Sequence, residues 1–134
     1  MGRPRRWRSC RRTGGSDSQE GASAVKQFSV AQMTGGWFVG DFEPSVIRTQ
    51  AFEVAVKYYQ PGDRESRHVH KVADEITVVA QGKVRMSGRT FTTGDIILIP
   101  VDEPTDFEVL EPAITVVVKR PSVIGDKYEV EEGA

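Results

Sequence analysis

The segment that decides the fold runs from residue 62 to residue 82 and reads GDRESRHVHKVADEITVVAQG. His68 and His70 lie two residues apart within it, and they are the only histidines in the chain. If this segment is a strand, its two-residue period places both imidazoles on one face. Glu75 follows after a short corner, where the next strand can point its carboxylate the same way. Two imidazoles and one carboxylate suit a divalent first-row metal and leave coordination positions open for substrate, oxygen or water.

The spacing of this segment resembles the first sequence motif of the cupin family. The matching residues are Gly62, His68, His70, Glu75 and Gly82, separated by five, one, four and six residues. The resemblance implies a single antiparallel β-barrel or jelly roll, the double-stranded β-helix of the cupins. It also implies a metal site made by His68, His70 and Glu75, which would hold a divalent transition metal such as Fe, Mn, Ni, Co, Cu or Zn.

The second cupin motif is matched only in part. Gly94 and Pro100, separated by five residues, stand at the expected spacing. Cupins then typically carry a glycine and a histidine that supplies a fourth ligand, but Asp102 and Thr105 occupy those positions here. Alternation along the strand turns Thr105 inward and Asp106 outward, so the neighbouring carboxylate is poorly placed to replace the missing histidine.

The rest of the chain consists of short apolar runs separated by turn residues, without helical periodicity of useful length. We expect Gln81-Gly82 to form a turn from which the following strand returns. Strands this short, spaced by turns, predict an all-β antiparallel sandwich or barrel in one domain over residues 24–134. The expected strands are residues 52–58, 75–80, 83–86, 96–99, 105–110 and 114–119.

The first 23 residues differ in composition from the rest of the chain. Six arginines and no acidic residue lie among the first twelve positions. We expect residues 1–23 to form a disordered extension rich in Arg, Gly and Ser, because they lack the apolar surface that offsets chain entropy. A nucleic-acid-binding arm and a targeting segment are the alternative interpretations.

Composition also restricts partners and compartment. The net charge of the 134-residue chain is −1, so the part that follows the basic head is acidic, which argues against a nucleic-acid groove. No apolar run approaches the roughly 18 residues that cross a bilayer. Cys10 is the single cysteine, which excludes an internal disulfide and favours a cytoplasmic location. The apolar strands at 52–58 and 114–119 favour a homodimer, and Trp37 in the lead-in is best interpreted as core or dimer packing.

Two functions stay open at this point. The resemblance implies a small metal-dependent enzyme of the dioxygenase, isomerase or lyase class, acting on a small polar or carbohydrate-like molecule. The alternative is a non-catalytic module that binds a small molecule or sugar with a structural metal or none. A metal-free sugar epimerase ranks last, because both histidines stand in ligand spacing. Lys57 and Arg85 could neutralise an anionic ligand at the barrel mouth, although charges on half-exposed strands are usually solvated.

Overall fold

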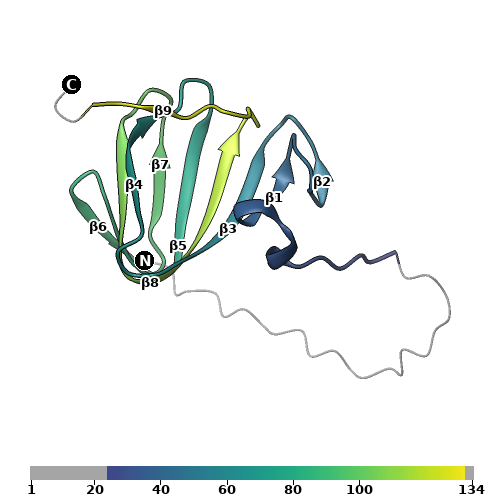
Figure 1. Ribbon diagram of the computed structural model, residues 1–134, viewed down its shortest axis with the longest axis horizontal. Helices are drawn as coiled ribbons and strands as arrows, with labels where there is room; N and C mark the ends of the chain where they lie inside the picture. The colour runs from purple at the N-terminus through teal and green to yellow at the C-terminus, as the bar shows by residue number, and fades with distance from the viewer. Residues whose placement is uncertain (1–23, 132–134) are drawn as a thin grey trace, which may run out of the picture.

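The computed structural model describes residues 24–131, and β-strands dominate this part of the chain (Figure 1). The predicted all-β class is therefore confirmed. The extension expected at residues 1–23 lies outside the described residues, as do residues 132–134 at the end of the predicted domain. None of the helices in the described range is long and apolar enough to span a membrane. Along the chain the elements are the 3-10 turns η1 (Val30–Gln32) and η2 (Thr34–Gly36), then β1 (Trp37–Gly40), β2 (Ile47–Arg48), β3 (Glu53–Tyr59), β4 (Arg64–Val69), β5 (Asp74–Met86), β6 (Arg89–Thr92), β7 (Ile96–Ile99), β8 (Thr105–Arg120) and β9 (Tyr128–Glu129).

Strand β8 organises the sheet because both of its edges are paired. Its first residues pair with β4 and its last residues with β3, whereas β5 lies along its other edge. We predicted two strands here, at 105–110 and 114–119, but the structure joins them into one. The register of the pairing with β5 is irregular around Glu111 and Pro112, where proline has no N–H to donate to the ladder. The result is one long, bent strand shared by two parts of the sheet.

Strand β5 corrects a second expectation. The predicted turn at Gln81-Gly82 is absent, and β5 continues through it to Met86 with several register shifts against β8. Gly82 has a φ of 96°, and a Cβ there would collide with the carbonyl of Pro112, so the glycine permits a bulge rather than a reversal. The chain reverses instead at Ser87-Gly88, two residues with positive φ that join β5 to β6, as hairpin turns require.

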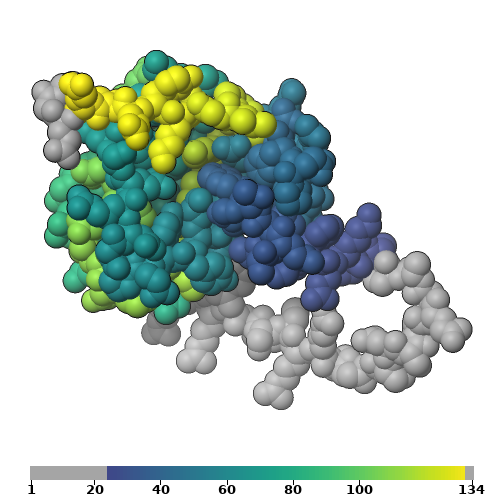
Figure 2. Space-filling view, in the orientation of Figure 1, coloured from purple at the N-terminus to yellow at the C-terminus, as the bar shows by residue number. Residues whose placement is uncertain are grey.

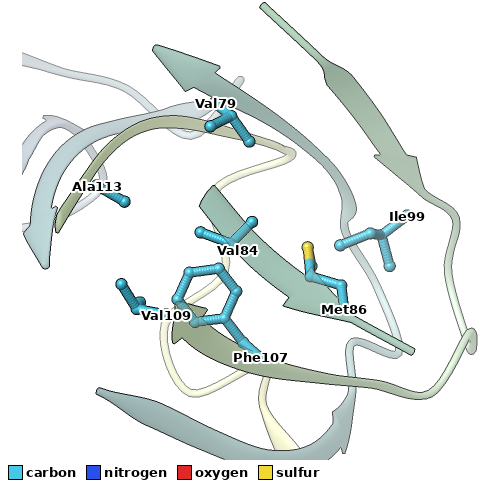
Figure 3. Close-up of a cluster of buried hydrophobic side chains, with 7 residues drawn as sticks. All are labelled: Val79, Val84, Met86, Ile99, Phe107, Val109 and Ala113. Atoms are coloured by element: carbon cyan, nitrogen blue, oxygen red, sulfur yellow. The ribbon is translucent and has the colours of Figure 1, made fainter. Parts of the chain in front are cut away.

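A buried apolar cluster fills the space between the strands, and its side chains point toward one another in Figure 3. Its members alternate with outward residues along β5 and β8, as a half-buried strand predicts. Phe107 and Met86 belong to this cluster and also line the polar cavity described below, so the apolar core forms the floor of that cavity. The cluster consists of Val79, Val84, Met86, Ile99, Phe107, Val109 and Ala113.

Strand pairing in residues 24–131 forms an open path. The order is β2-β1-β3-β8-β4-β9, and β5 branches from β8 and carries β6 and β7. Every pair is antiparallel except β1 with β2. The predicted antiparallel architecture therefore agrees with the structure, but closure of the sheet into a barrel is not confirmed, because no pairing among these residues joins the two ends of the path.

Candidate metal centre and its cavity

Strands β4 and β5 bring the three predicted metal ligands to one cavity. His68 lies near the end of β4 and His70 directly follows the strand, and they keep only 5% and 3% of their surface exposed. Their rings meet edge to face with centroids 5.3 Å apart. Glu75 is the second residue of β5 and lines the same cavity.

Backbone carbonyls fix the orientation of both imidazoles. The Nδ1 atom of His68 lies 2.8 Å from the carbonyl oxygen of Ser66, and Nδ1 of His70 is hydrogen-bonded to the carbonyl oxygen of Asp126. Because a carbonyl only accepts, each Nδ1 carries the proton and donates it. In the neutral imidazole the Nε2 lone pair is then free, which is the arrangement that metal-binding histidines commonly show.

The Nε2 atom of His70 is buried and makes no hydrogen bond within the described part of the chain. Its nearest acidic neighbour is Glu75, with Nε2 and Oε1 3.4 Å apart. A buried nitrogen without a partner costs free energy unless something binds it. This nitrogen is therefore a donor of the type that a transition metal binds.

Glu75 is surrounded by polar contacts that favour its charged form. Thr77 donates its hydroxyl to Oε2 at 3.0 Å, and the ammonium of Lys119 lies 4.0 Å from Oε1. Burial alone would raise the pKa of Glu75, but His70, Lys119 and Thr77 together hold it below its ordinary value. The same contact with Glu75 raises the pKa of His70 against the opposing effect of burial.

The three side chains do not converge on a single point. Within residues 24–131, no group of three histidine, cysteine, aspartate or glutamate side chains is gathered in a way that could hold a metal ion. The structure pairs His70 with Glu75 and sets the His68 ring beside His70. The ligand types are thus together in one cavity, in an arrangement in which Glu75 is engaged by His70 and Lys119.

Thr105, which stands where the cupin motif has its fourth ligand, faces the cavity. It is 7% exposed, lines the cavity, and is the cross-strand neighbour of His68. Asp106 points outward and accepts a hydrogen bond from the backbone N–H of Ser87. The strand phase predicted from Pro100 is confirmed, so no carboxylate from this strand replaces the missing histidine.

The cavity has a volume of about 160 Å³. More lysine side chains line it than the sequence pattern suggested. Lys57 lines it, as one of the two sequence interpretations proposed. Arg85 lies elsewhere and pairs with Glu108 at 3.5 Å, so the solvated interpretation holds for that residue. Sequence reasoning missed Lys119, although it has the inward phase of Thr115 on the same strand. The full lining is Trp37, Lys57, Tyr59, Glu65, His68, His70, Glu75, Thr77, Met86, Thr105, Phe107, Thr115, Val117, Lys119 and Lys127.

The C-terminal segment closes one side of the cavity. Figure 2 shows it in yellow across the top of the strands, where β9 pairs with β4. The carboxylate of Asp126 accepts hydrogen bonds from the backbone N–H groups of Lys71, Val72 and Ala73. Lys127, the next residue, lines the cavity. Asp126 therefore ties the segment to the corner that follows His70, a role that no local sequence pattern indicates.

Comparisons with known proteins identify the fold. No protein-family model and no curated protein matches the chain. An uncharacterized conserved protein with a double-stranded β-helix domain from Klebsiella pneumoniae superposes with a TM-score of 0.57 at 23% identity, covering 79% of this chain and 99% of that one. The protein has the double-stranded β-helix fold, which the cupin resemblance implies. The cupin resemblance predicted from the histidine segment is thereby confirmed.

Two further solved structures share this fold. KdgF from Halomonas sp. has a TM-score of 0.53 at 24% identity, covering 58% of this chain and 77% of that one. Oxalate decarboxylase from Bacillus subtilis, described with Mn(II) centres, has a TM-score of 0.52 at 20% identity. That match covers 61% of this chain, and the chain spans only about a quarter of the decarboxylase, 25% of its length. At these identities the likeness establishes the fold.

Proposed function

We propose that the protein binds a divalent transition metal through His68, His70 and Glu75, and that it is a small metal-dependent enzyme. Its reaction would belong to the dioxygenase, isomerase or lyase class and its substrate would be a small polar or carbohydrate-like molecule. The observation that carries the proposal is the buried Nε2 atom of His70, which has no hydrogen-bond partner in the described residues while its Nδ1 proton is held by a carbonyl.

Each residue of the cavity would have a distinct role in metal binding. In the neutral imidazoles, the carbonyls of Ser66 and Asp126 hold the proton on Nδ1 and leave Nε2 for a metal. Metal binding would displace the Nε2 proton that Glu75 favours on His70. Glu75 supplies the negative charge, and Thr77 fixes the direction of its carboxylate. A bound divalent metal would act as a Lewis acid toward a substrate oxygen. Thr105, which is a poor ligand while its hydroxyl is protonated, leaves room for the substrate beside His68.

The alternative, a non-catalytic binding module, is supported by a specific observation. The three ligand side chains do not converge, and Glu75 is already engaged by His70 and Lys119. A cavity of this kind could hold a small molecule by hydrogen bonds without any metal. The two functions differ in one measurable respect, because removal of the metal abolishes turnover in an enzyme and lowers only stability in a binding module.

Metal analysis tests the proposal directly. The full chain, purified without chelator, should contain about one divalent transition metal per chain by elemental analysis. His68→Ala, His70→Ala and Glu75→Ala should each lose it, and Thr105→Ala should retain it as the matched control within the same cavity. Added metal at 100 times its dissociation constant should stabilise the wild type by about 2.7 kcal/mol. Substoichiometric metal in the wild type, with no stabilisation by any of the six ions, would contradict the proposal.

The outer face of the sheet formed by strands β3, β8, β5 and β7 is apolar, and this bears on whether the protein forms oligomers. Their register aligns two rows of four residues, all aliphatic, and the β7 end is the most exposed, with Ile96 at 71% and Leu98 at 66%. Contiguous apolar rows of this kind are typical of an interface, whereas single exposed aliphatic residues are ordinary. The rows are Val54, Val118, Ile76 and Leu98, and Val56, Val116, Val78 and Ile96.

We also propose that a second copy of the chain covers this face, so that the protein is a homodimer. No position in the two rows carries a charge, and an identical face can therefore pack against it about a twofold axis without burying an unpaired ion. Residues 1–23 are a poor alternative cover, because they contain six arginines and only four hydrophobic residues, Met1, Trp7, Cys10 and Ala22.

A further inference from the structure

Two lysine ammonium groups lie near one indole ring at the wall of the cavity. Lys57 on β3 and Lys119 on β8 both have the inward strand phase, and both line the cavity. Their Nζ atoms lie 5.0 Å and 5.1 Å from the ring centroid of Trp37. The face of an indole stabilises a cation but leaves its positive charge uncancelled. Two ammonium groups are thus held at the wall of one small, partly buried cavity.

The carboxylates of the cavity do not neutralise Lys57. Glu65 is 3.8 Å from the ammonium of Lys127, and Glu75 is shared between His70 and Lys119. Among residues 24–131, Lys57 has no carboxylate within ion-pair distance, and its one hydrogen bond goes to the carbonyl of Gly35 at 3.1 Å. Burial lowers the pKa of Lys57, with Glu65 opposing this effect. A half-buried ammonium without a counter-ion is costly unless an anion binds it.

A buried hydroxyl lies on the strand next to Lys57. Thr115 is the direct cross-strand neighbour of Lys57 in the pairing of β3 with β8. Thr115 is 1% exposed, and its Oγ1 atom is buried. The hydroxyl of Tyr59 interacts with it, so Thr115 can accept from Tyr59 and donate its own proton to a ligand oxygen. It lines the same cavity as the two lysines.

Lys57 also makes a structural hydrogen bond, which uses only one of the donors of its ammonium group. Its bond to Gly35 and its position over Trp37 tie the lead-in turn η2 to β3. An ammonium has three donors, and that bond uses one of them. The remaining two are enough to hold an anionic oxygen.

We infer that Lys57, Lys119 and Thr115 form a subsite for the carboxylate of a small organic acid. This inference rests on the proposed function in that it names the ligand class of the same cavity. The volume of about 160 Å³ is well below the roughly 300–1,000 Å³ of pockets that hold drug-sized ligands, so the acid has few non-hydrogen atoms. A carboxylate presents two oxygens, which can accept hydrogen bonds from the two ammonium groups and from the hydroxyl.

Calorimetric titration with matched acid and amide probes tests the inference. Glycolate and its neutral amide, glycolamide, have nearly the same size and differ in charge. The decisive titration uses the full chain freed of metal and of chelator, because glycolate also binds metals. We expect glycolate to bind about tenfold or more tightly than glycolamide, as charge-assisted hydrogen bonds predict. A parallel titration uses metal-loaded protein.

Variants locate the binding on the proposed residues. Lys57→Gln should weaken glycolate about tenfold or more and leave glycolamide unchanged, whereas Lys57→Arg should retain most of the affinity. Lys83→Gln is the matched control, since Lys83 is a half-buried lysine of β5 that does not line the cavity. If Lys57→Gln unfolds, Thr115→Val removes the hydroxyl with little change of shape and should weaken glycolate several-fold.

The outcomes separate this inference from the proposed metal site. Equal affinity for glycolate and glycolamide, or glycolate binding that ignores Lys57 and Thr115, would overturn the subsite. Tighter binding of inorganic phosphate than of glycolate would overturn the carboxylate assignment. Lys57-dependent binding of glycolate to a protein that never retains metal would support the subsite and contradict the metal site. Stoichiometric metal with no acid binding would do the reverse.

Discussion

The Nδ1 atom of His70 donates a hydrogen bond to the backbone carbonyl of Asp126, 56 residues further along the chain. The carboxylate of the same aspartate accepts the backbone N–H groups of the corner that follows His70. One residue of the C-terminal segment therefore fixes both the imidazole and the turn that leads to Glu75. This contact makes the C-terminal segment part of the candidate site rather than a loose end of the fold.

Replacing Asp126 by alanine should destabilise the protein by about 2 kcal/mol, because the N–H groups of residues 71–73 lose an ionised acceptor. Chemical denaturation measures the change. Asp106→Ala is the control, since that exposed aspartate accepts a single hydrogen bond, from Ser87, and should cost far less. Equal losses for the two variants would show that the C-terminal segment adds little to stability.

Acid should remove the contribution of Asp126 in a defined direction. Burial would raise its pKa, but the N–H groups of Ala73, Lys71 and Val72 lower it by more, so the folded-state pKa lies below the ordinary 3.8. A depressed carboxyl pKa gives stability that is complete above pH 3.8 and is lost as the pH falls through the folded-state pKa. The stability difference between wild type and Asp126→Asn should therefore shrink from neutral pH to about pH 3. A difference that stays constant over this range would contradict the assignment.

Thr105→His should add a fourth ligand, because Thr105 faces the cavity as the cross-strand neighbour of His68. We expect metal affinity to rise by about 10- to 100-fold, the size of effect produced by changes around a metal. Thr105→Ala should change it little. Anaerobic titration of the three proteins with one metal decides the point. If turnover uses the open position, Thr105→His should bind metal more tightly and turn over more slowly.

Substitutions at Gly82 and Gly94 separate the cost of backbone strain at positive φ from the cost of a steric clash of the added Cβ. Their φ angles are 96° and 94°, but a Cβ at Gly94 meets nothing, whereas one at Gly82 meets Pro112 and Ala113. Gly94→Ala should cost about 1–2 kcal/mol for the unfavourable φ. Gly82→Ala should cost about 1–3 kcal/mol more, because the bulge of β5 must move away from β8. Urea unfolding of both variants gives the comparison, and equal costs would mean that the bulge is compliant.

Leu98→Glu should dissociate the proposed homodimer, since it places a charge in the exposed part of the apolar rows. Light scattering after size exclusion should give twice the chain mass for the wild type and the chain mass for the variant. Ile124→Glu is the control, because Ile124 is 73% exposed and lies outside those rows. A wild type that is monomeric at high concentration would exclude the second copy as the cover.

Sequence alone predicts the all-β class, the cupin resemblance and the inward phase of His68, His70 and Thr105. These features follow from a two-residue period and fixed spacings, which act over a few residues. The same two-residue period places Lys119 on the inward face of its strand, although we predicted no role for that residue. The strand at 96–99 was predicted with its observed bounds, because Gly94-Asp95 and Pro100 limit it on both sides.

Contacts between distant residues depend on the tertiary structure. The expected turn at Gln81-Gly82 became a bulge because β5 pairs with β8 on both sides of it, a constraint that lies outside the local sequence. Asp126 reaches His70, and Trp37 lies beside Lys57 and Lys119, through strand pairings that are distant in sequence. Local patterns fix the face on which a side chain lies, whereas the partner across the cavity depends on the path of the whole chain.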